Sequence, residues 1–272
     1  MDLTQSEPRA VLCMDLDGTL INHNEEAHPR DIDLLNNFPE EILPILATGR
    51  SLPSARGVLD QNGILQGGPF PLPAVFINGA VTQLPNEDIL DVHYLEDSLL
   101  PDLIELTRIF ASTAFFFYQP DKAYLVNTTL TGKWLSRLHY LNALECQAEN
   151  LPRQINKAMA VDKDLTVIDQ IREYTRDLPV EMGTSLPFIF ELSPLGITKA
   201  NSIRALLAAM GYDGLPIYAV GDGENDLTVK PMAEKFFVPA TAQESVRNQA
   251  DLIIDSAQDG ILSPILDFIL SN

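Results

Sequence analysis

The stretch AVLCMDLDGT, residues 10–19, is the most informative part of the chain, because an apolar run ends there in two aspartates and a glycine. Such a run predicts a buried strand. Side chains alternate along a strand, so Asp15 and Asp17 point to the same side of it. In an open α/β sheet, ligands bind at the carboxyl ends of the strands, which is where this pair lies.

Two carboxylates this close repel each other unless a cation binds them or one of them carries a proton. Gly18 lets the chain turn sharply and brings backbone N–H groups near an anion. Asp15, Asp17 and Gly18 therefore predict a divalent metal ion, an anionic substrate and an acid–base pair at this strand end. The alternative is an ordinary strand-to-turn junction with solvated aspartates.

The composition narrows the class of protein. The chain has 272 residues, 46% of them hydrophobic, which is enough for one large core or two moderate ones. Its net charge of -20 argues against nucleic acid or an anionic membrane as a partner, so a phosphate site must be positive locally. Two cysteines indicate no disulfide framework, and the N-terminal residues lack a signal-peptide pattern. We expect a cytoplasmic protein.

Apolar runs and amphipathic segments alternate in the first and last thirds of the chain. The first third predicts strands at 11–14, 42–47 and 74–77 and helices at 30–38 and 52–62. The last third predicts helices at 199–210 and 261–270 and strands at 217–220, 236–238 and 252–254. This alternation is typical of α/β folds. We expect residues 1–80 and 190–272 to form one Rossmann-like core with a doubly wound parallel sheet.

Residues 81–189 have a different pattern. Hairpin-like pairs of strands around 85–88 and 119–122 are mixed with predicted helices at 99–110, 132–143 and 164–176. Hairpins imply antiparallel pairing, which distinguishes this region from the flanking segments. We expect an inserted α+β domain here.

A second acidic cluster, Gly221–Asp226, follows the predicted strand 217–220 just as Asp15 follows the first strand. Glycines on both sides of Asp222 suit a tight loop at a metal site, although a Gly/Asp-rich turn is the simpler interpretation of this cluster alone. Together with Asp15 and Asp17, Asp222 indicates Mg²⁺, which prefers oxygen ligands.

Two shorter signals indicate anion binding. Thr48 ends a predicted strand directly before Gly49 and Arg50, so its hydroxyl and the nearby backbone N–H groups could bind a phosphoryl oxygen. Lys199 begins a predicted helix and could reach toward an anion. Taken alone, the first signal is more typical of a turn, and a lysine on a helix is usually solvated.

In this order, the clusters at Asp15–Thr19, Thr48, Lys199 and Gly221–Asp226 resemble the four motifs of the haloacid dehalogenase superfamily of phosphotransferases. The resemblance covers the whole chain. The long insert between Thr48 and Lys199 is most similar to that of the Cof-like group, which has an α/β cap of type IIB. Residues 227–232 and 238–242 depart from the usual pattern of that group, although neither segment contains an expected catalytic residue.

The resemblance implies roles for individual residues. Asp15 would attack phosphorus, and Asp17 would protonate the leaving oxygen and then activate water. Mg²⁺ would bind the Asp15 carboxylate, the Asp17 backbone carbonyl and Asp222. Residues with implied phosphate-binding or supporting roles are Gly18, Thr48, Gly49, Arg50, Lys199, Asn225 and Asp226, with a structural role equally open for Arg50.

We therefore expect a Mg²⁺-dependent phosphatase that hydrolyses a small phosphorylated metabolite, with a sugar phosphate as the favoured class, through an aspartyl-phosphate. The resemblance also implies that the cap excludes water and supplies specificity. A phosphomannomutase-like sugar phosphomutase is the alternative, and a catalytically silent binding protein is a third reading. We expect a monomer or a homodimer.

Overall fold

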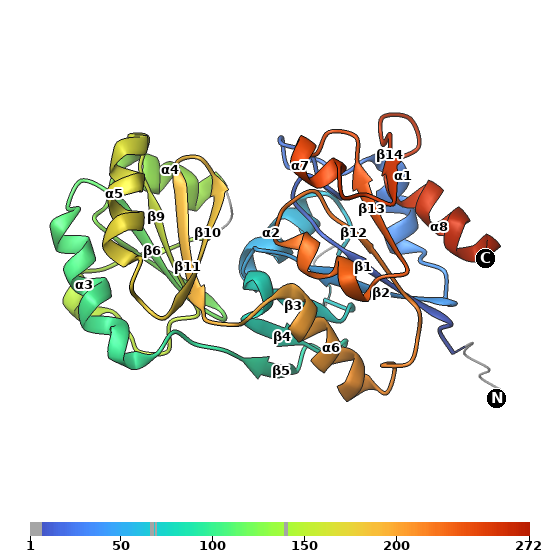
Figure 1. Ribbon diagram of the computed structural model, residues 1–272, viewed down its shortest axis with the longest axis horizontal. Helices are drawn as coiled ribbons and strands as arrows, with labels where there is room; N and C mark the ends of the chain where they lie inside the picture. The colour runs from blue at the N-terminus through green and yellow to red at the C-terminus, as the bar shows by residue number, and fades with distance from the viewer. Residues whose placement is uncertain (1–6, 66–67, 69, 139–140) are drawn as a thin grey trace. The chain divides into compact units, whose positions relative to one another are not determined.

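Strand β1 (Ala10–Met14) carries the apolar run and is buried along its whole length in an eight-stranded sheet. The computed structural model describes residues 7–65, 68, 70–138 and 141–272. Two units are distinguished by their internal contacts and can be followed in Figure 1. The core unit comprises Met1–Gly49, Val58–Leu90 and Thr198–Asn272, and the inserted unit comprises Arg50–Gly57 and Asp91–Ile197.

The core sheet has the strand order β14-β13-β12-β1-β2-β3-β4-β5. All pairings from β14 to β3 are parallel. The strands are β2 (Ile42–Ala47), β3 (Ala74–Phe76), β12 (Ile217–Val220), β13 (Lys235–Pro239) and β14 (Leu252–Ile254). Chain order runs outward in opposite directions from β1 and β12, so the loops after these two strands flank the switch point at which α/β sheets bind ligands. The expected Rossmann-like, doubly wound α/β core is confirmed.

Helices lie on both faces of this sheet. The helices of the core unit are α1 (Pro29–Asn36), α6 (Lys199–Met210), α7 (Glu244–Arg247) and α8 (Leu262–Ser271). Helix α2 (Leu52–Gln61) begins in the inserted unit and ends in the core unit. Ile203 of α6 belongs to the same buried cluster as Val11 and Cys13 of β1. Met14, one residue further along β1, faces the other way and lines a small apolar cavity with Leu35 of α1. Because successive side chains of β1 point to opposite faces of the sheet, β1 contributes apolar contacts on both faces.

Two further strands extend the core sheet. β4 (Val81–Gln83) pairs with β3 in antiparallel fashion, and β5 (Ile89–Val92) forms the edge. The insert expected from the sequence, residues 81–189, contains both strands, whereas the contact-defined insert resumes at Asp91 and ends at Ile197. A hairpin pattern predicts two strands but not the sheet that they join. The sheet depends on which other strand offers unpaired backbone N–H and C=O groups, and that strand can lie far away in the sequence.

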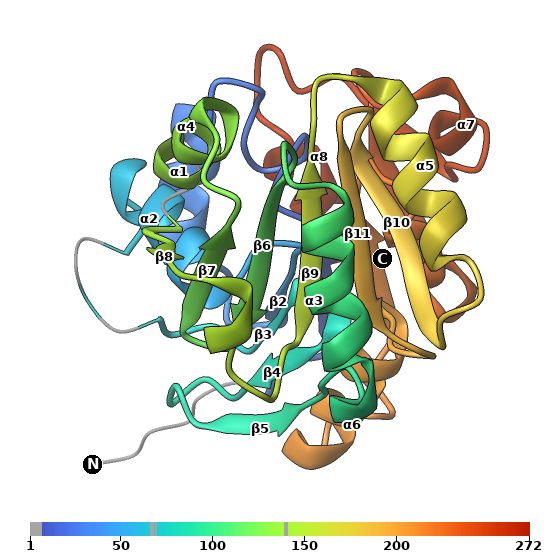
Figure 2. The same cartoon turned by 90° about the vertical axis from the view of Figure 1, so that its left-hand side faces the viewer.

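The inserted unit is an α+β structure around a six-stranded sheet of order β10-β11-β9-β6-β7-β8. Its strands are β6 (Ala114–Gln119), β7 (Lys122–Val126), β8 (Leu144–Glu145), β9 (Lys157–Val161), β10 (Val180–Leu186) and β11 (Ile189–Pro194). Its helices α3 (Leu100–Ile109), α4 (Leu130–Leu138) and α5 (Leu165–Thr175) can be followed in Figure 2. Phe115, Phe117 and Phe190 pack with Leu103 and Ile168 of α3 and α5 in one buried cluster.

Strand β10 has no counterpart among the strands predicted from the sequence. Its stretch VEMGTSL contains Gly183 and several polar residues, and it lies at the edge of its sheet. An edge strand with one neighbour needs no continuous apolar pattern, so its hydropathy signal is weak.

Among the described residues, no helix has the length and apolar composition that crossing a membrane requires.

Candidate active site

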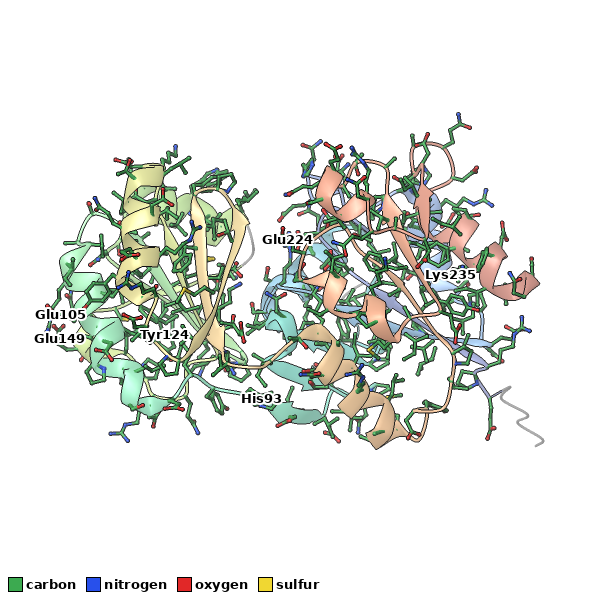
Figure 3. The ribbon with its side chains drawn as sticks, in the orientation of Figure 1. His93, Glu105, Tyr124, Glu149, Glu224 and Lys235 are labelled. Atoms are coloured by element: carbon green, nitrogen blue, oxygen red, sulfur yellow. The ribbon has the colours of Figure 1, made fainter. Side chains whose placement is uncertain are left out.

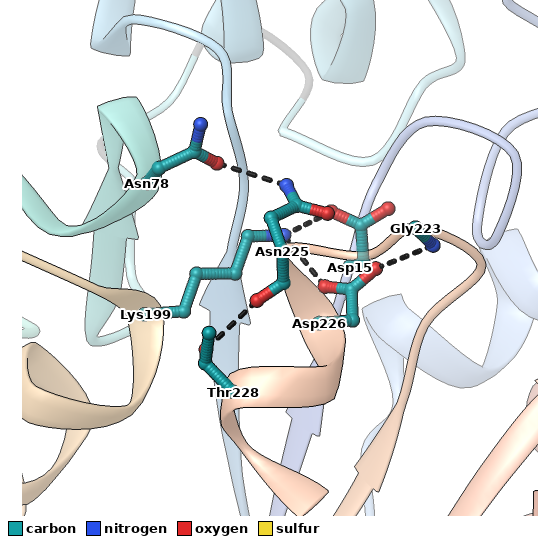
Figure 4. Close-up of polar contacts among 7 residues, drawn as sticks. All are labelled: Asp15, Asn78, Lys199, Gly223, Asn225, Asp226 and Thr228. Atoms are coloured by element: carbon teal, nitrogen blue, oxygen red, sulfur yellow. Dashed lines mark hydrogen bonds and ion pairs between the residues drawn. The ribbon is translucent and has the colours of Figure 1, made fainter. Parts of the chain in front are cut away.

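The centre of the site is a buried lysine between two aspartates. Lys199 lies at the start of α6, where the side chain of Thr198 caps the helix by accepting from the N–H of Asn201. The Lys199 Nζ lies 2.7 Å from Asp15 Oδ1, at the end of β1, and 2.7 Å from Asp226 Oδ1, in the loop after β12. Figure 4 shows this arrangement. The structure thus brings together three residues from distant parts of the chain, and it excludes the alternative that Lys199 is an ordinary solvated lysine.

The electrostatics of the cluster are strongly perturbed. Burial, together with the negative charge of Asp226, raises the pKa of Asp15 well above its ordinary value, although Lys199 opposes the shift. Burial acts to lower the pKa of Lys199, but Asp15 and Asp226 together outweigh it and raise that pKa. Burial also raises the pKa of Asp222 to about 6, and Asp226 adds to the shift. Three carboxyl groups therefore share a single lysine, so the cluster has a surplus of negative charge whenever all three are ionised.

This surplus of negative charge is what a divalent cation would offset. Asp15, Asp222 and Asp226 each offer a carboxylate oxygen, and these oxygens lie within 4.8 Å of one another. A Cβ on Gly18 would lie 2.1 Å from Asp222 Oδ2, so only glycine leaves room for this carboxylate beside the turn. An all-oxygen donor set fits Mg²⁺. The residues present therefore fit the metal that the sequence predicts.

Asp17 and Gly18 lie in the turn directly after β1. Gly18 has a φ of 75°, in the left-handed region that favours glycine, and its N–H donates to the carbonyl of Ile21. The side chain of Asp17 is exposed and is not one of the three clustered carboxylates among the described residues. Its charge nevertheless raises the pKa of both Asp15 and Asp222. Asp17 thus lies at the open side of the cluster, in reach of solvent.

The predicted phosphate-binding residues lie in three places. Thr48, at the end of β2, is fully buried, and its N–H donates to the carbonyl of Val75. Gly49 follows it, whereas Arg50 groups with the inserted unit and is buried with its Nη1 3.4 Å from Ser54 Oγ. Asn225 is exposed in the loop after β12, the loop in which Figure 3 labels Glu224.

Asp226 has a supporting position within that loop. Its Oδ2 accepts from the N–H of Gly223 at 3.0 Å while its Oδ1 binds Lys199. A Cβ on Gly221 would lie 2.5 Å from Asp226 Oδ2, so this glycine allows the tight turn that the cluster requires. Asp226 therefore couples the shape of the loop to the position of the lysine.

Sequence reasoning missed Asn78, in the turn after β3. Asn225 Nδ2 donates to Asn78 Oδ1 at 2.9 Å, and the backbone N–H of Asn78 donates to the carbonyl of Thr48. The signal in the sequence is Asn78-Gly79 directly after an apolar run, the same strand-then-glycine pattern as at Asp15. Its link to Asn225 joins positions 147 residues apart, which no local pattern indicates.

Comparison with known proteins agrees with this geometry. Residues 12–265 match the family of haloacid dehalogenase-like hydrolases. An uncharacterized hydrolase of Schizosaccharomyces pombe is 25% identical over 98% of this chain and 93% of its own. A 5-amino-6-(5-phospho-D-ribitylamino)uracil phosphatase of Bacillus subtilis is 21% identical over 96% of each chain.

The fold also has solved counterparts. A sugar phosphatase of subclass IIB of the haloacid dehalogenase superfamily superposes with a TM-score of 0.77, at 17% identity, over 96% of this chain and 99% of the other. The resemblance noted from the four motifs is thereby confirmed. With a match that spans nearly the whole sequence, this chain belongs to the haloacid dehalogenase-like hydrolases.

Proposed function

We propose that this enzyme is a Mg²⁺-dependent phosphatase that hydrolyses a small phosphorylated metabolite through an aspartyl-phosphate on Asp15. The observation that carries the proposal is the buried group of Asp15, Lys199 and Asp226, with Asp222 beside it, at the switch point of the sheet. The phosphatase named among the relatives and the sugar phosphatase with the same fold support a sugar phosphate as the favoured class.

In this proposal, the carboxylates of Asp15 and Asp222 and the backbone carbonyl of Asp17 would hold the metal. It would supply positive charge that offsets the surplus carboxylates and the phosphoryl oxygens. Lys199 opposes the rise that burial causes in the pKa of Asp15, because its Nζ lies 2.7 Å from Oδ1, and so favours the ionised carboxylate. An ionised carboxylate is the form that can act as a nucleophile.

The reaction would proceed in two displacements. A carboxylate oxygen of Asp15 forms a bond to phosphorus while the P–O bond to the leaving group breaks, and Asp17 donates a proton to the leaving oxygen. Asp17 then takes a proton from water, which attacks phosphorus, breaks the aspartyl-phosphate and releases phosphate. The exposed position of Asp17 suits a group that exchanges protons with leaving group and water.

The remaining residues would bind the transferring group. Lys199 offsets the charge on its oxygens, and the backbone of Gly18 and Gly49, the hydroxyl of Thr48 and the amide of Asn225 offer hydrogen-bond donors. Arg50 is proposed as an additional contact, and Asp226 as the support of Lys199. The insert expected over residues 81–189 is proposed to select the substrate. We propose that the protein works in the cytoplasm as a monomer or a homodimer.

The test is phosphate release from a panel of hexose phosphates, nucleotides and cofactor phosphates, with Mg²⁺ and with EDTA. We expect release from one class, only with Mg²⁺. Asp15→Asn should abolish turnover, whereas Asp259→Asn, at an exposed aspartate, should not. Full activity in Asp15→Asn would refute the aspartyl-phosphate. An isomerised hexose phosphate without phosphate release would identify a mutase instead.

A further inference from the structure

We propose that Asn78 is a positioning residue for this site: its side chain holds the amide of Asn225 in one orientation, and its backbone holds the end of β2. The inference rests on the proposed function, because it concerns how the phosphate-binding loops are kept in register. All of the residues that carry it lie in the core unit. The turn that contains Asn78, η1 (Ile77–Gly79), contributes no residue to the family motifs noted above.

The contacts of Asn78 join loops that are not neighbours in the sheet. Its Oδ1 accepts from Asn225 Nδ2 at 2.9 Å, and Asn225 follows β12. Its backbone N–H donates to the carbonyl of Thr48 at 3.1 Å, and Thr48 follows β2. In the sheet, β1 lies between β2 and β12. Asn78 thus ties together the loops on the two sides of the strand that ends in Asp15.

The same turn contacts the helix that carries Lys199. Ser202 Oγ donates to the carbonyl of Gly79 at 2.8 Å. A Cβ on Gly79 would lie 2.7 Å from the carbonyl oxygen of Thr198, the residue before Lys199, so the turn and the first turn of α6 approach as closely as glycine permits. The position of Lys199 therefore also depends on this turn.

The backbone of the turn is held in a costly conformation. Ile77 has a φ of 52° and Asn78 a φ of 54°. Positive φ is rare for a β-branched residue such as Ile77, although asparagine tolerates it better than most residues. Strain of this kind persists where the surrounding contacts hold it, and it is concentrated at functional sites. Here the holding contacts are those to Thr48, Asn225 and Ser202.

The contact also determines which end of the Asn225 amide points where. Figure 4 shows the amide nitrogen of Asn225 directed at Asn78. The amide oxygen of Asn225 lies beside Gly223, where an added Cβ would be 2.4 Å from Oδ1. Asn225 is exposed, so without Asn78 nothing in these contacts would keep its amide from rotating. If the Asn225 side chain is already ordered before the substrate arrives, substrate binding does not have to supply the conformational entropy of ordering it.

Hydrolysis of para-nitrophenyl phosphate with Mg²⁺ tests the proposal in the full chain. The variants are Asn78→Gly, which keeps a backbone that accepts positive φ but removes Oδ1, Asn225→Ala, and the two combined. We expect Asn78→Gly to lower kcat/KM about three- to tenfold, the effect of losing one side-chain hydrogen bond. The double variant should be no worse than Asn225→Ala alone, because Asn78 acts through Asn225.

The matched control is Asn37→Gly, at another asparagine of the core unit, whose side-chain Nδ2 donates to the carbonyl of Asp33 at 3.0 Å. It should leave kcat/KM unchanged. Wild-type kcat/KM in Asn78→Gly, or losses that simply add in the double variant, would overturn the inference.

A second readout separates this inference from the proposed function. The side-chain NH₂ resonances of Asn225 can be followed by NMR in the metal-free protein, whether or not the wild type hydrolyses any phosphate ester. We expect them to shift in Asn78→Gly and not in Asn37→Gly. If they do not shift, Asn78 does not hold Asn225, and the inference fails even if the enzyme is a phosphatase.

Discussion

Replacing Lys199 with methionine should destabilise the protein far more than the loss of an ordinary lysine. The Lys199 side chain has no exposed surface, and those of Asp15 and Asp226 are 7% and 5% exposed. Methionine is about as long and removes the charge, which leaves two buried carboxylates without their cation. Breaking a buried ion pair by removing one partner costs about 3–5 kcal/mol. We expect a loss in that range at pH 7 in EDTA.

The assay is urea denaturation followed by far-UV circular dichroism, with EDTA present so that no metal replaces the lysine. The matched control is Lys122→Met, because the Lys122 Nζ lies 3.8 Å from Asp121 Oδ2 and its side chain is 53% exposed. An exposed pair of this kind is worth about 0–1 kcal/mol. Equal unfolding midpoints for Lys199→Met and the wild type would refute the reasoning.

The pH dependence of Lys199→Met provides a check on the cause. The pKa of Asp15 is raised by burial even with Lys199 present. A carboxyl whose folded pKa is raised binds protons more tightly when folded, so its penalty is absent below its ordinary pKa, grows as pH rises and is complete above the folded pKa. The stability lost in Lys199→Met should therefore shrink as pH falls and the carboxyls become protonated. A loss that does not change with pH would indicate a packing defect instead.

Three other predictions follow from the same structure. Because the folded pKa of Asp222 is raised to about 6, metal-free protein should become less stable as pH rises from about 4 to 6, and Asp222→Asn should remove that part of the pH profile measured by thermal unfolding. Gly18→Ala should weaken Mg²⁺ binding measured by calorimetry, because its Cβ would lie 2.1 Å from Asp222 Oδ2; Gly211→Ala, with a φ of 78° and nothing within 4 Å, is the control that should leave binding intact. Asp31→Ala should cost about 1–3 kcal/mol of unfolding free energy and leave kcat/KM unchanged, because the buried carboxylate accepts from the N–H groups of Ile261 and Leu262 at the start of α8.

Much of the core could be predicted from local patterns. A buried parallel strand is a continuous apolar run, and the helices that cover it repeat apolar residues at helical spacing, so both leave signals within a few residues. β1, β2, β12 and α6 all appear in the structure close to their expected positions. The edge strand β10 was not predicted, and the hairpin pattern around 85–88 predicted β4 and β5 but not the sheet that they join, because a strand's own pattern does not specify its pairing partner.

The candidate active site was also predictable only in part. The residue types that could do the chemistry were evident from local patterns, because Asp15, Asp17 and Asp222 all lie within three residues of the end of an apolar run. That Lys199 is a buried partner of Asp15, 184 residues away, rather than a solvated lysine, became evident only in the folded chain. The tertiary structure alone brought Asn78 to Asn225. The physical reason is that a pattern records the spacing of neighbours along one strand or helix, whereas an ion pair or hydrogen bond between loops depends on the order of strands in the sheet.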